Sequence, residues 1–266
     1  MKEKGMADWQ KIVVKVGTST IVDLDGQIKY PVVNRLAQTL STLQKDGHQV
    51  LLVTSGAIGV ALNQMNLHQR PKEIPKQQAL AAIGQGYLMS LYHQSFAFYQ
   101  QQVGQVLLTY DVFDNPVMLE NTTNAIETLF DQGVIPIINE NDVIAVDELD
   151  HQHSFGDNDR LAALVAKQIQ ADGLIILSDV DALYTANPNI DQNAKPIHRV
   201  EAITETIWLS ATGSTSGLGT GGMSTKLAAA DLTMKNGQKM ALVNGNDPAN
   251  ILAVIAGEEI GTLFEE

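Results

Sequence analysis

Short apolar runs alternate along most of this chain with longer segments in which apolar residues recur every three or four positions. The runs are rich in Val, Ile and Leu, as is typical of buried strands, and the longer segments have helical periodicity. Strands are therefore predicted at residues 11–16, 49–54, 103–109, 134–138, 174–177, 239–243 and 261–264. Helices are predicted at residues 31–46, 75–99, 119–130, 158–169, 223–235 and 248–256.

Apolar strands joined through helices indicate an α/β fold with a largely parallel central sheet covered on both faces. We expect a three-layer α/β/α sandwich that forms a single domain over residues 1–266, because no repeat or Pro-rich linker divides the chain. Residues 1–8 are expected to be a flexible N-terminus. Ligands of such sheets bind beyond the carboxyl ends of the strands. The residues that follow each strand are therefore the candidates for function.

The chain carries 17 basic and 30 acidic residues, which gives a net charge of −13. This charge argues against general affinity for nucleic acid or anionic membranes, and an anionic substrate would need a locally positive site. The chain has neither an apolar run of about 18 residues nor the apolar core of a signal peptide. It contains no cysteine, which excludes disulfides, Cys-ligated zinc and thiol catalysis. We expect a cytoplasmic protein.

A glycine-rich segment, residues 217–226, ends in Lys226 at the start of a predicted helix. Free backbone N–H groups, a helix N-terminus and one positive charge suit a phosphate. The segment is not a Walker A loop, because Met223 stands where the lysine should follow the last glycine. It matches G-x-G-x-x-G, but it follows the polar run 210–216 and not a strand. A flexible surface loop with a helix cap is the alternative.

Two further candidates follow the first two strands. Lys15 interrupts an apolar strand just before Gly17, and its amine could reach a phosphate. Alternatively, it is a solvent-facing lysine on an edge strand. Ser55 and Gly56 offer a hydroxyl and free amides to an anion, or Ser55 caps a helix. A nucleophilic serine in a G-x-S-x-G elbow is excluded by Val53.

Acidic and amide residues cluster at residues 139–142 and 156–160. Their oxygen acceptors suit a ligand ammonium or a metal, although helix capping would account for some of them. Residues 178–181 either line a nucleotide pocket or form a turn. His151 and His153 have a spacing that could bind zinc, but we interpret them as solvent-exposed loop histidines.

Together these segments resemble the glutamate 5-kinases of the amino-acid kinase family. The matching blocks occur in the family's order and span nearly the whole chain, at residues 13–19, 54–57, 139–142, 156–159, 183–185 and 219–226. The chain resembles the form without the C-terminal PUA domain, a fold associated with RNA binding. Asn187 stands where an Asp is expected before Pro188, which places a detail of the nucleotide-side loop in question.

The resemblance implies ATP-dependent phosphorylation of the γ-carboxylate of L-glutamate to γ-glutamyl phosphate, the first step of proline synthesis. Mg²⁺ would accompany ATP, held mainly by its phosphates. The implied catalytic residues are Lys15, Lys226, Asp159 and Gly56. The implied glutamate-binding residues are Ser55, Asn139, Asp142, Asp157 and Asn158. The implied nucleotide-binding residues are Lys15, Ser178, Asp179, Thr220, Gly221, Gly222, Met223, Ser224, Thr225 and Lys226.

The resemblance also implies a homo-oligomer, proline as a feedback inhibitor, glutamyl phosphate reductase as a partner enzyme, and no nucleic-acid partner. Two alternatives stay open. One is a related kinase acting on aspartate, acetylglutamate, carbamate or a nucleoside monophosphate, against which residues 17–19 and 156–159 argue. The other is a dinucleotide-dependent oxidoreductase or a non-catalytic nucleotide-binding regulator, against which the late position of the glycine-rich segment argues.

Overall fold

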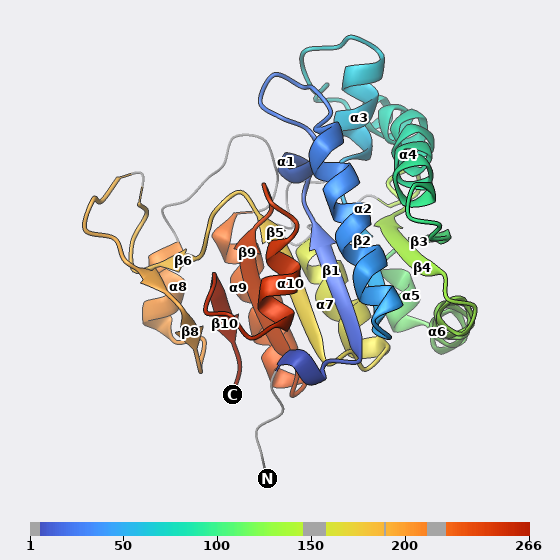
Figure 1. Ribbon diagram of the computed structural model, residues 1–266. Coiled ribbons are helices and arrows are strands. Elements are labelled where there is room, and N and C mark those ends of the chain that lie inside the picture. The colour runs from blue at the N-terminus through green and yellow to red at the C-terminus, as the bar shows by residue number, and fades with distance from the viewer. Residues whose placement is uncertain (1–5, 146–157, 189, 212–221) are drawn as a thin grey trace.

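An eight-stranded sheet forms the middle layer of the computed structural model (Figure 1). The structure describes residues 6–145, 158–188, 190–211 and 222–266. Across the sheet the strands run in the order β3 (Val103–Leu108), β4 (Ile135–Glu140), β2 (Gln49–Thr54), β1 (Lys11–Val16), β5 (Gly173–Ser178), β9 (Lys239–Asn244), β10 (Thr262–Phe264) and β8 (Arg199–Val200). The first six are parallel, and β10 is antiparallel to β9. The predicted, largely parallel sheet is confirmed.

Alternating side chains of each strand supply two separate cores, one on each face of the sheet. In β1, Ile12 and Val14 face one core and Val13 faces the other. The first core is completed by α2 (Tyr30–Lys45), α3 (Ala57–Gln64), α4 (Ile74–Ala97) and α10 (Asn250–Ile255). The second is completed by α5 (Asp111–Asp114), α6 (Pro116–Asp131), α7 (Asn158–Gln168), α8 (Glu205–Ala211) and α9 (Met223–Lys235). The three-layer α/β/α sandwich is therefore confirmed.

The remaining elements are short. They are a 3₁₀ helix, η1 (Met6–Asp8), the single-turn α1 (Thr18–Ile21), and a two-stranded ribbon of β6 (Leu183–Tyr184) and β7 (Pro196–Ile197). Within the N-terminus that we expected to be flexible, η1 leads into Trp9, which is buried over Gly173, and residues 1–5 lie outside the described part. No helix among the described residues is long and apolar enough to cross a membrane.

The order of the strands reverses at β1. After β1 the chain continues to β2 on one side, and after β4 it crosses to β5 on the other side of β1. Helices that leave neighbouring strands in opposite directions open a crevice at the carboxyl ends of those strands. β1 is thus a central strand paired on both sides, which excludes the edge-strand interpretation of Lys15.

Gly84 allows α4 to pack directly against the start of α3. A Cβ atom at Gly84 would lie 1.8 Å from the carbonyl oxygen of Ala57, the first residue of α3. The two backbones can approach this closely only without a side chain at this position. The contact holds the turn between β2 and α3, which borders the crevice, at a fixed height above the sheet.

We expect Gly84→Ala to lower the free energy of unfolding by about 3 kcal/mol, because the added methyl must push α3 away from α4. Gly86→Ala is the matched control on the same helix, where an added Cβ would meet no atom within 4 Å. The control should raise stability by about 0.5–1 kcal/mol, because alanine favours the helix over glycine. Urea denaturation measures both variants, and equal stability of the two would contradict the close contact.

Candidate active site

A cavity of about 810 Å³ lies at the carboxyl ends of β1, β2 and β5, at the point where the strand order reverses. Its walls are mostly polar. Among the residues predicted for the site, the lining includes Lys15, Ser55, Gly56, Asn139, Asp142, Asn158, Ser178, Asp179 and Lys226. Sequence segments separated by more than 200 positions thus meet around one space.

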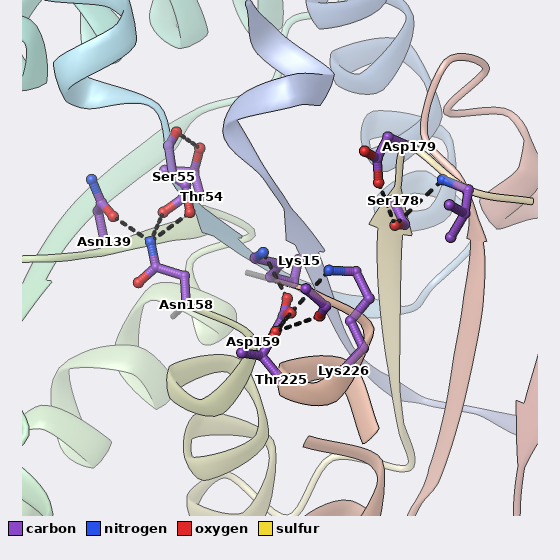
Figure 2. A network of polar contacts seen from close by, with 12 residues as sticks. Lys15, Thr54, Ser55, Asn139, Asn158, Asp159, Ser178, Asp179, Thr225 and Lys226 are labelled. Atoms are coloured by element: carbon purple, nitrogen blue, oxygen red, sulfur yellow. Dashed lines mark hydrogen bonds and ion pairs between the residues drawn. The ribbon is translucent and has the colours of Figure 1, made fainter. Parts of the chain in front are cut away.

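Asp159 lies between two lysines beside this cavity (Figure 2). Its Oδ1 is 2.6 Å from Lys15 Nζ, and its Oδ2 is 3.2 Å from Lys226 Nζ. The exposed fractions of the three side chains are 0% for Asp159, 4% for Lys15 and 9% for Lys226. One carboxylate and two ammonium groups leave an excess of one positive charge. The charge beside the cavity is therefore positive although the net charge of the chain is −13, and a positive local charge is what the binding of an anion requires.

The periodicity of β1 explains why Lys15 points toward Asp159. Val13 faces the core formed with α7 and α9, and Lys15, two residues further on, lies on the same face. It occupies the end of the strand, where α7 and α9 begin. Asp159 stands in the first turn of α7, and Lys226 in the first turn of α9. The lysine that interrupts an apolar strand is therefore buried at the rim of the sheet.

Thr225 is a further partner of the central carboxylate. Its Oγ1 lies 3.0 Å from Asp159 Oδ2 and 2.9 Å from the carbonyl oxygen of Gly222. The single hydroxyl proton of Thr225 can be shared between these two acceptors. The contact ties the first turn of α9 to the first turn of α7, on the side from which Lys226 enters.

Two helices begin at the cavity with no side-chain cap. α3 begins after Gly56, whose φ of 101° favours glycine, and α9 begins after Gly222. Neither capping residue makes a side-chain hydrogen bond to the first turn. A glycine cap has no side chain that could bond to the first turn, and helix N-termini of this kind suit an anion because their N–H groups and the helix dipole provide partial positive charge.

Three amide and hydroxyl side chains form a second group on the other side of the cavity (Figure 2). Asn158 Nδ2 lies 2.8 Å from the carbonyl oxygen of Thr54, 2.8 Å from Ser55 Oγ and 3.0 Å from Asn139 Oδ1. Asn158 and Asn139 are buried. Together with Asp142, which also lines the cavity, the group provides hydroxyl and carboxylate contacts for a small polar ligand.

Behind Thr54 stands a buried tyrosine of α4. The Tyr92 hydroxyl is 2.7 Å from Thr54 Oγ1, which itself donates to the carbonyl oxygen of Ser55 at 3.0 Å. Burial raises the pKa of Tyr92 well above its usual value, so its hydroxyl stays protonated. The end of β2 is thus held in place by a neutral hydrogen bond from the helix above it.

Ser178 and Asp179 follow β5 at a third position on the cavity wall. Ser178 Oγ donates to Asp179 Oδ1 at 3.1 Å, and Ser178 itself is buried whereas Asp179 is exposed. Figure 2 shows the pair on the far side of the two lysines from Asn158. The cavity therefore has two polar ends with the positive cluster between them.

The structure separates the residues predicted in the glycine-rich segment. Lys226 lines the cavity and Thr225 binds Asp159, whereas Met223 packs on the second core and Ser224 is exposed. The predicted residues Asp157, Thr220 and Gly221, and the histidines His151 and His153, lie outside the described residues.

Sequence reasoning missed Gln85 and Tyr92, and it included Thr54 in a matching block without giving it a role. Gln85 and Tyr92 lie inside a long helix, where their spacing of seven residues indicates only a shared helix face. Their contacts to the ends of β4 and β2 arise from packing between elements, so no local pattern could have indicated them.

Comparison with known proteins gives a consistent result. The sequence profile described as "Amino acid kinase family" matches residues 10–244. The glutamate 5-kinase of Oenococcus oeni is 60% identical over 264 residues, which cover 99% of this chain and 98% of that protein. The glutamate 5-kinase of Lactiplantibacillus plantarum is 51% identical and is aligned over 96% of each chain.

Solved structures support the fold. An isopentenyl phosphate kinase from T. acidophilum superimposes with a TM-score of 0.66 at 16% identity, covering 96% of this chain and all (100%) of that one. The UMP kinase from Bacillus anthracis superimposes with a TM-score of 0.64 at 13% identity, over 96% and 95% of the two chains. At these identities the similarity concerns the fold alone.

We expect Asp159→Asn to lower the free energy of unfolding by about 3–5 kcal/mol, because the change removes one partner of a buried ion-pair cluster. Inorganic pyrophosphate should then raise the melting temperature more in the variant than in the parent, since an anion replaces the lost charge between the lysines.

Asp231→Asn is the control for Asp159→Asn. It breaks the i,i+4 pair with Lys235 on the outside of α9, which should change stability by less than about 0.5 kcal/mol. Thermal unfolding with and without pyrophosphate measures both effects. If Asp159→Asn proved no less stable than the control, the cluster would not be the anchor described here.

Proposed function

The chain belongs to the amino acid kinase family, and from this premise we propose that it transfers the γ-phosphoryl group of ATP to the γ-carboxylate of L-glutamate. The product is γ-glutamyl phosphate, and the reaction is the first step of proline biosynthesis. The observation that carries the proposal is the cluster of Lys15, Asp159 and Lys226 between the two polar ends of one cavity. The curated glutamate 5-kinases that align over nearly the whole chain support glutamate as the acceptor.

The chemistry requires charge neutralisation more than proton transfer. A carboxylate is ionised at neutral pH and needs no general base to become a nucleophile. A lone pair of a γ-carboxylate oxygen forms the new bond to the γ-phosphorus as the bond from that phosphorus to the bridging oxygen breaks, and the electron pair of the broken bond leaves on the β-phosphate oxygen of ADP. Negative charge on the transferring group is stabilised by Lys15 and Lys226, which enter from β1 and α9. The amide of Gly56, at the N-terminus of α3, would be a third donor.

Asp159 is a positioning residue in this mechanism. A lysine side chain has a flexible stem of four carbons. An ion pair with a fixed carboxylate restricts the position of its ammonium group. Because Asp159 binds the two lysines through its two different oxygens, it fixes the positions of both ammonium groups beside the cavity. The pair keeps its net positive charge, since one carboxylate cannot neutralise both lysines.

The polar end formed by Ser55, Asn139, Asp142 and Asn158 suits glutamate. Asp142 offers a carboxylate to the substrate α-ammonium, and the Ser55 hydroxyl offers a donor to a carboxylate. We assign Asp157 to the same end on the family resemblance. The opposite end, with Ser178 and Asp179, would receive the nucleotide, and residues 220–226 would cover its phosphates.

Mg²⁺ would enter this site on the nucleotide. Both oxygens of Asp159 are engaged by lysines, and the described residues contain no group of three acidic or histidine side chains that could hold a metal. A magnesium ion that keeps phosphate and water ligands fits such a site, because Mg²⁺ often binds through substrate phosphates. When bound, it neutralises charge on the β- and γ-phosphates.

Three finer statements belong to the same proposal. The chain would form a homo-oligomer, proline would inhibit it, and glutamyl phosphate reductase would consume its labile product. Proline shares the α-carboxylate and α-amino groups of glutamate, so the residues that bind glutamate could also bind the inhibitor. For assembly, exposed apolar side chains such as Ile144 and Val117, with exposed fractions of 67% and 66%, offer contact area.

Lys15→Met and Lys226→Met should each lower kcat by about 10²–10³-fold, because each removes one group that stabilises transition-state charge. The assay traps the acyl phosphate formed from ATP and L-glutamate as its hydroxamate. Lys235→Met, on the exposed side of the last turn of α9, is the matched control and should retain full activity. Near-normal kcat in either cavity variant would refute the assigned role. Absence of product from the parent chain with glutamate would refute the proposed function.

Light scattering of the purified chain should give a particle mass of two or more times 28.8 kDa. The reason is that exposed apolar side chains favour contact with another copy. A mass of 28.8 kDa at all concentrations tested would contradict the oligomer.

A further inference from the structure

Gln85 of α4 lies outside the cavity but is bonded to a residue that lines it. Its Oε1 accepts a hydrogen bond from Asn139 Nδ2 at 2.8 Å, whereas Asn139 contacts the cavity at the end of β4. Gln85 is not part of the cavity lining, so we consider its effect on a ligand through the orientation of Asn139.

The orientation of the Asn139 amide follows from a backbone group. The N–H of Glu140 donates to Asn139 Oδ1 at 2.9 Å, and a backbone N–H can only donate. The oxygen of Asn139 must therefore face Glu140, and its nitrogen must face Gln85. Figure 2 shows this nitrogen pointing away from the rest of the group. The acceptor oxygen of Gln85 completes this arrangement, since it is the partner of the nitrogen.

The orientation of Asn158 follows in the same way. The carbonyl oxygen of Thr54 can only accept, so the group that faces it at 2.8 Å is Asn158 Nδ2. The same nitrogen meets Asn139 Oδ1 and Ser55 Oγ. Ser55 is thus an acceptor toward Asn158, which leaves its own hydroxyl proton available to a ligand in the cavity.

Gln85 makes this contact at a cost. Its Nε2 is buried and has no hydrogen-bond partner among the described residues. A buried amide with an unsatisfied donor is less favourable than an apolar side chain of the same shape. Filling space therefore does not explain why residue 85 is a glutamine. The hydrogen bond to Asn139 does explain it, because an apolar side chain could not make this bond.

We propose that Gln85 is a positioning residue for the acceptor substrate. It holds Asn139 so that the chain of hydrogen bonds from α4 through Asn139 and Asn158 presents the Ser55 hydroxyl as a donor to a carboxylate of glutamate. The inference rests on the proposed function, and it concerns substrate affinity and not the phosphoryl-transfer cluster of Lys15 and Lys226.

Gln85→Met removes the acceptor while keeping the length of the side chain. We expect KM for L-glutamate to rise about tenfold, because a displaced Asn139 weakens the hydrogen bond from Ser55 to the charged substrate carboxylate. KM for ATP and kcat should change by less than about twofold, because the lysine cluster is untouched. Gln94→Met is the matched control, since Gln94 lies on the same helix and bonds only to Ser90 among the described residues. An unchanged KM for glutamate in Gln85→Met would overturn the proposal.

Gln85→Glu tests whether the acceptor oxygen is what matters. A glutamate side chain presents an acceptor to Asn139 in either protonation state. KM for L-glutamate should therefore stay within about threefold of the parent value, as for one retained hydrogen bond. A rise as large as that of Gln85→Met would show that the bond to Asn139 is not the cause. This variant also keeps the test decisive if Gln85→Met does not fold.

A double-mutant cycle separates action through Asn139 from general damage to the helix. If Gln85 acts through Asn139, adding Gln85→Met to Asn139→Ala should raise KM for glutamate by less than about twofold further. If the increase in KM of the double variant equalled the product of the increases in the two single variants, the proposal would be overturned.

Failure of the proposed function is recognised separately, because the parent chain would then give no product with L-glutamate and the inference would fall with it.

Discussion

The structure depends on the burial of one carboxylate between two ammonium groups. Asp159 has no exposed side-chain surface, and an unpaired charge in that position would cost about 3–5 kcal/mol. Lys15 and Lys226 must therefore reach it from β1 and α9. This requirement brings the first turns of α7 and α9 to the end of β1. It also leaves one positive charge beside the cavity of a strongly acidic chain.

The backbone adds to this charge, because parallel strands joined through helices place helix N-termini at one edge of the sheet. α3 and α9 both begin at the cavity without a side-chain cap. Helix N-termini of this kind suit the same anion as the lysines. α4 supports this arrangement through the close approach of Gly84 to Ala57, through the hydrogen bond of Tyr92 to Thr54, and through Gln85, which accepts a hydrogen bond from Asn139. Elements from both faces of the sheet thus contribute to the site.

Most of the long elements could be predicted from the sequence, as could the short β10 and α10, whereas several other short elements could not. The helix at 223–235 and the strands at 11–16 and 49–54 have the predicted ends, because their apolar periods are complete. α8 was missed. The two-residue strands β6 and β7 were missed as well, since a two-residue strand has no hydrophobic period to detect. The helix α3 was also missed, although the turn at Ser55 and Gly56 was expected to lead into one.

The sequence by itself determined the α/β class, the family and the polar residues at the strand ends, because these features depend on local periodicity and on residue types in fixed order. Only the tertiary structure decided how those residues combine. The pairing of Lys15 with Asp159 joins positions 144 apart along the chain, and its bond length and burial depend on how α7 packs on β1. The contact of Gln85 with Asn139 likewise depends on packing between α4 and the sheet, which no local pattern encodes.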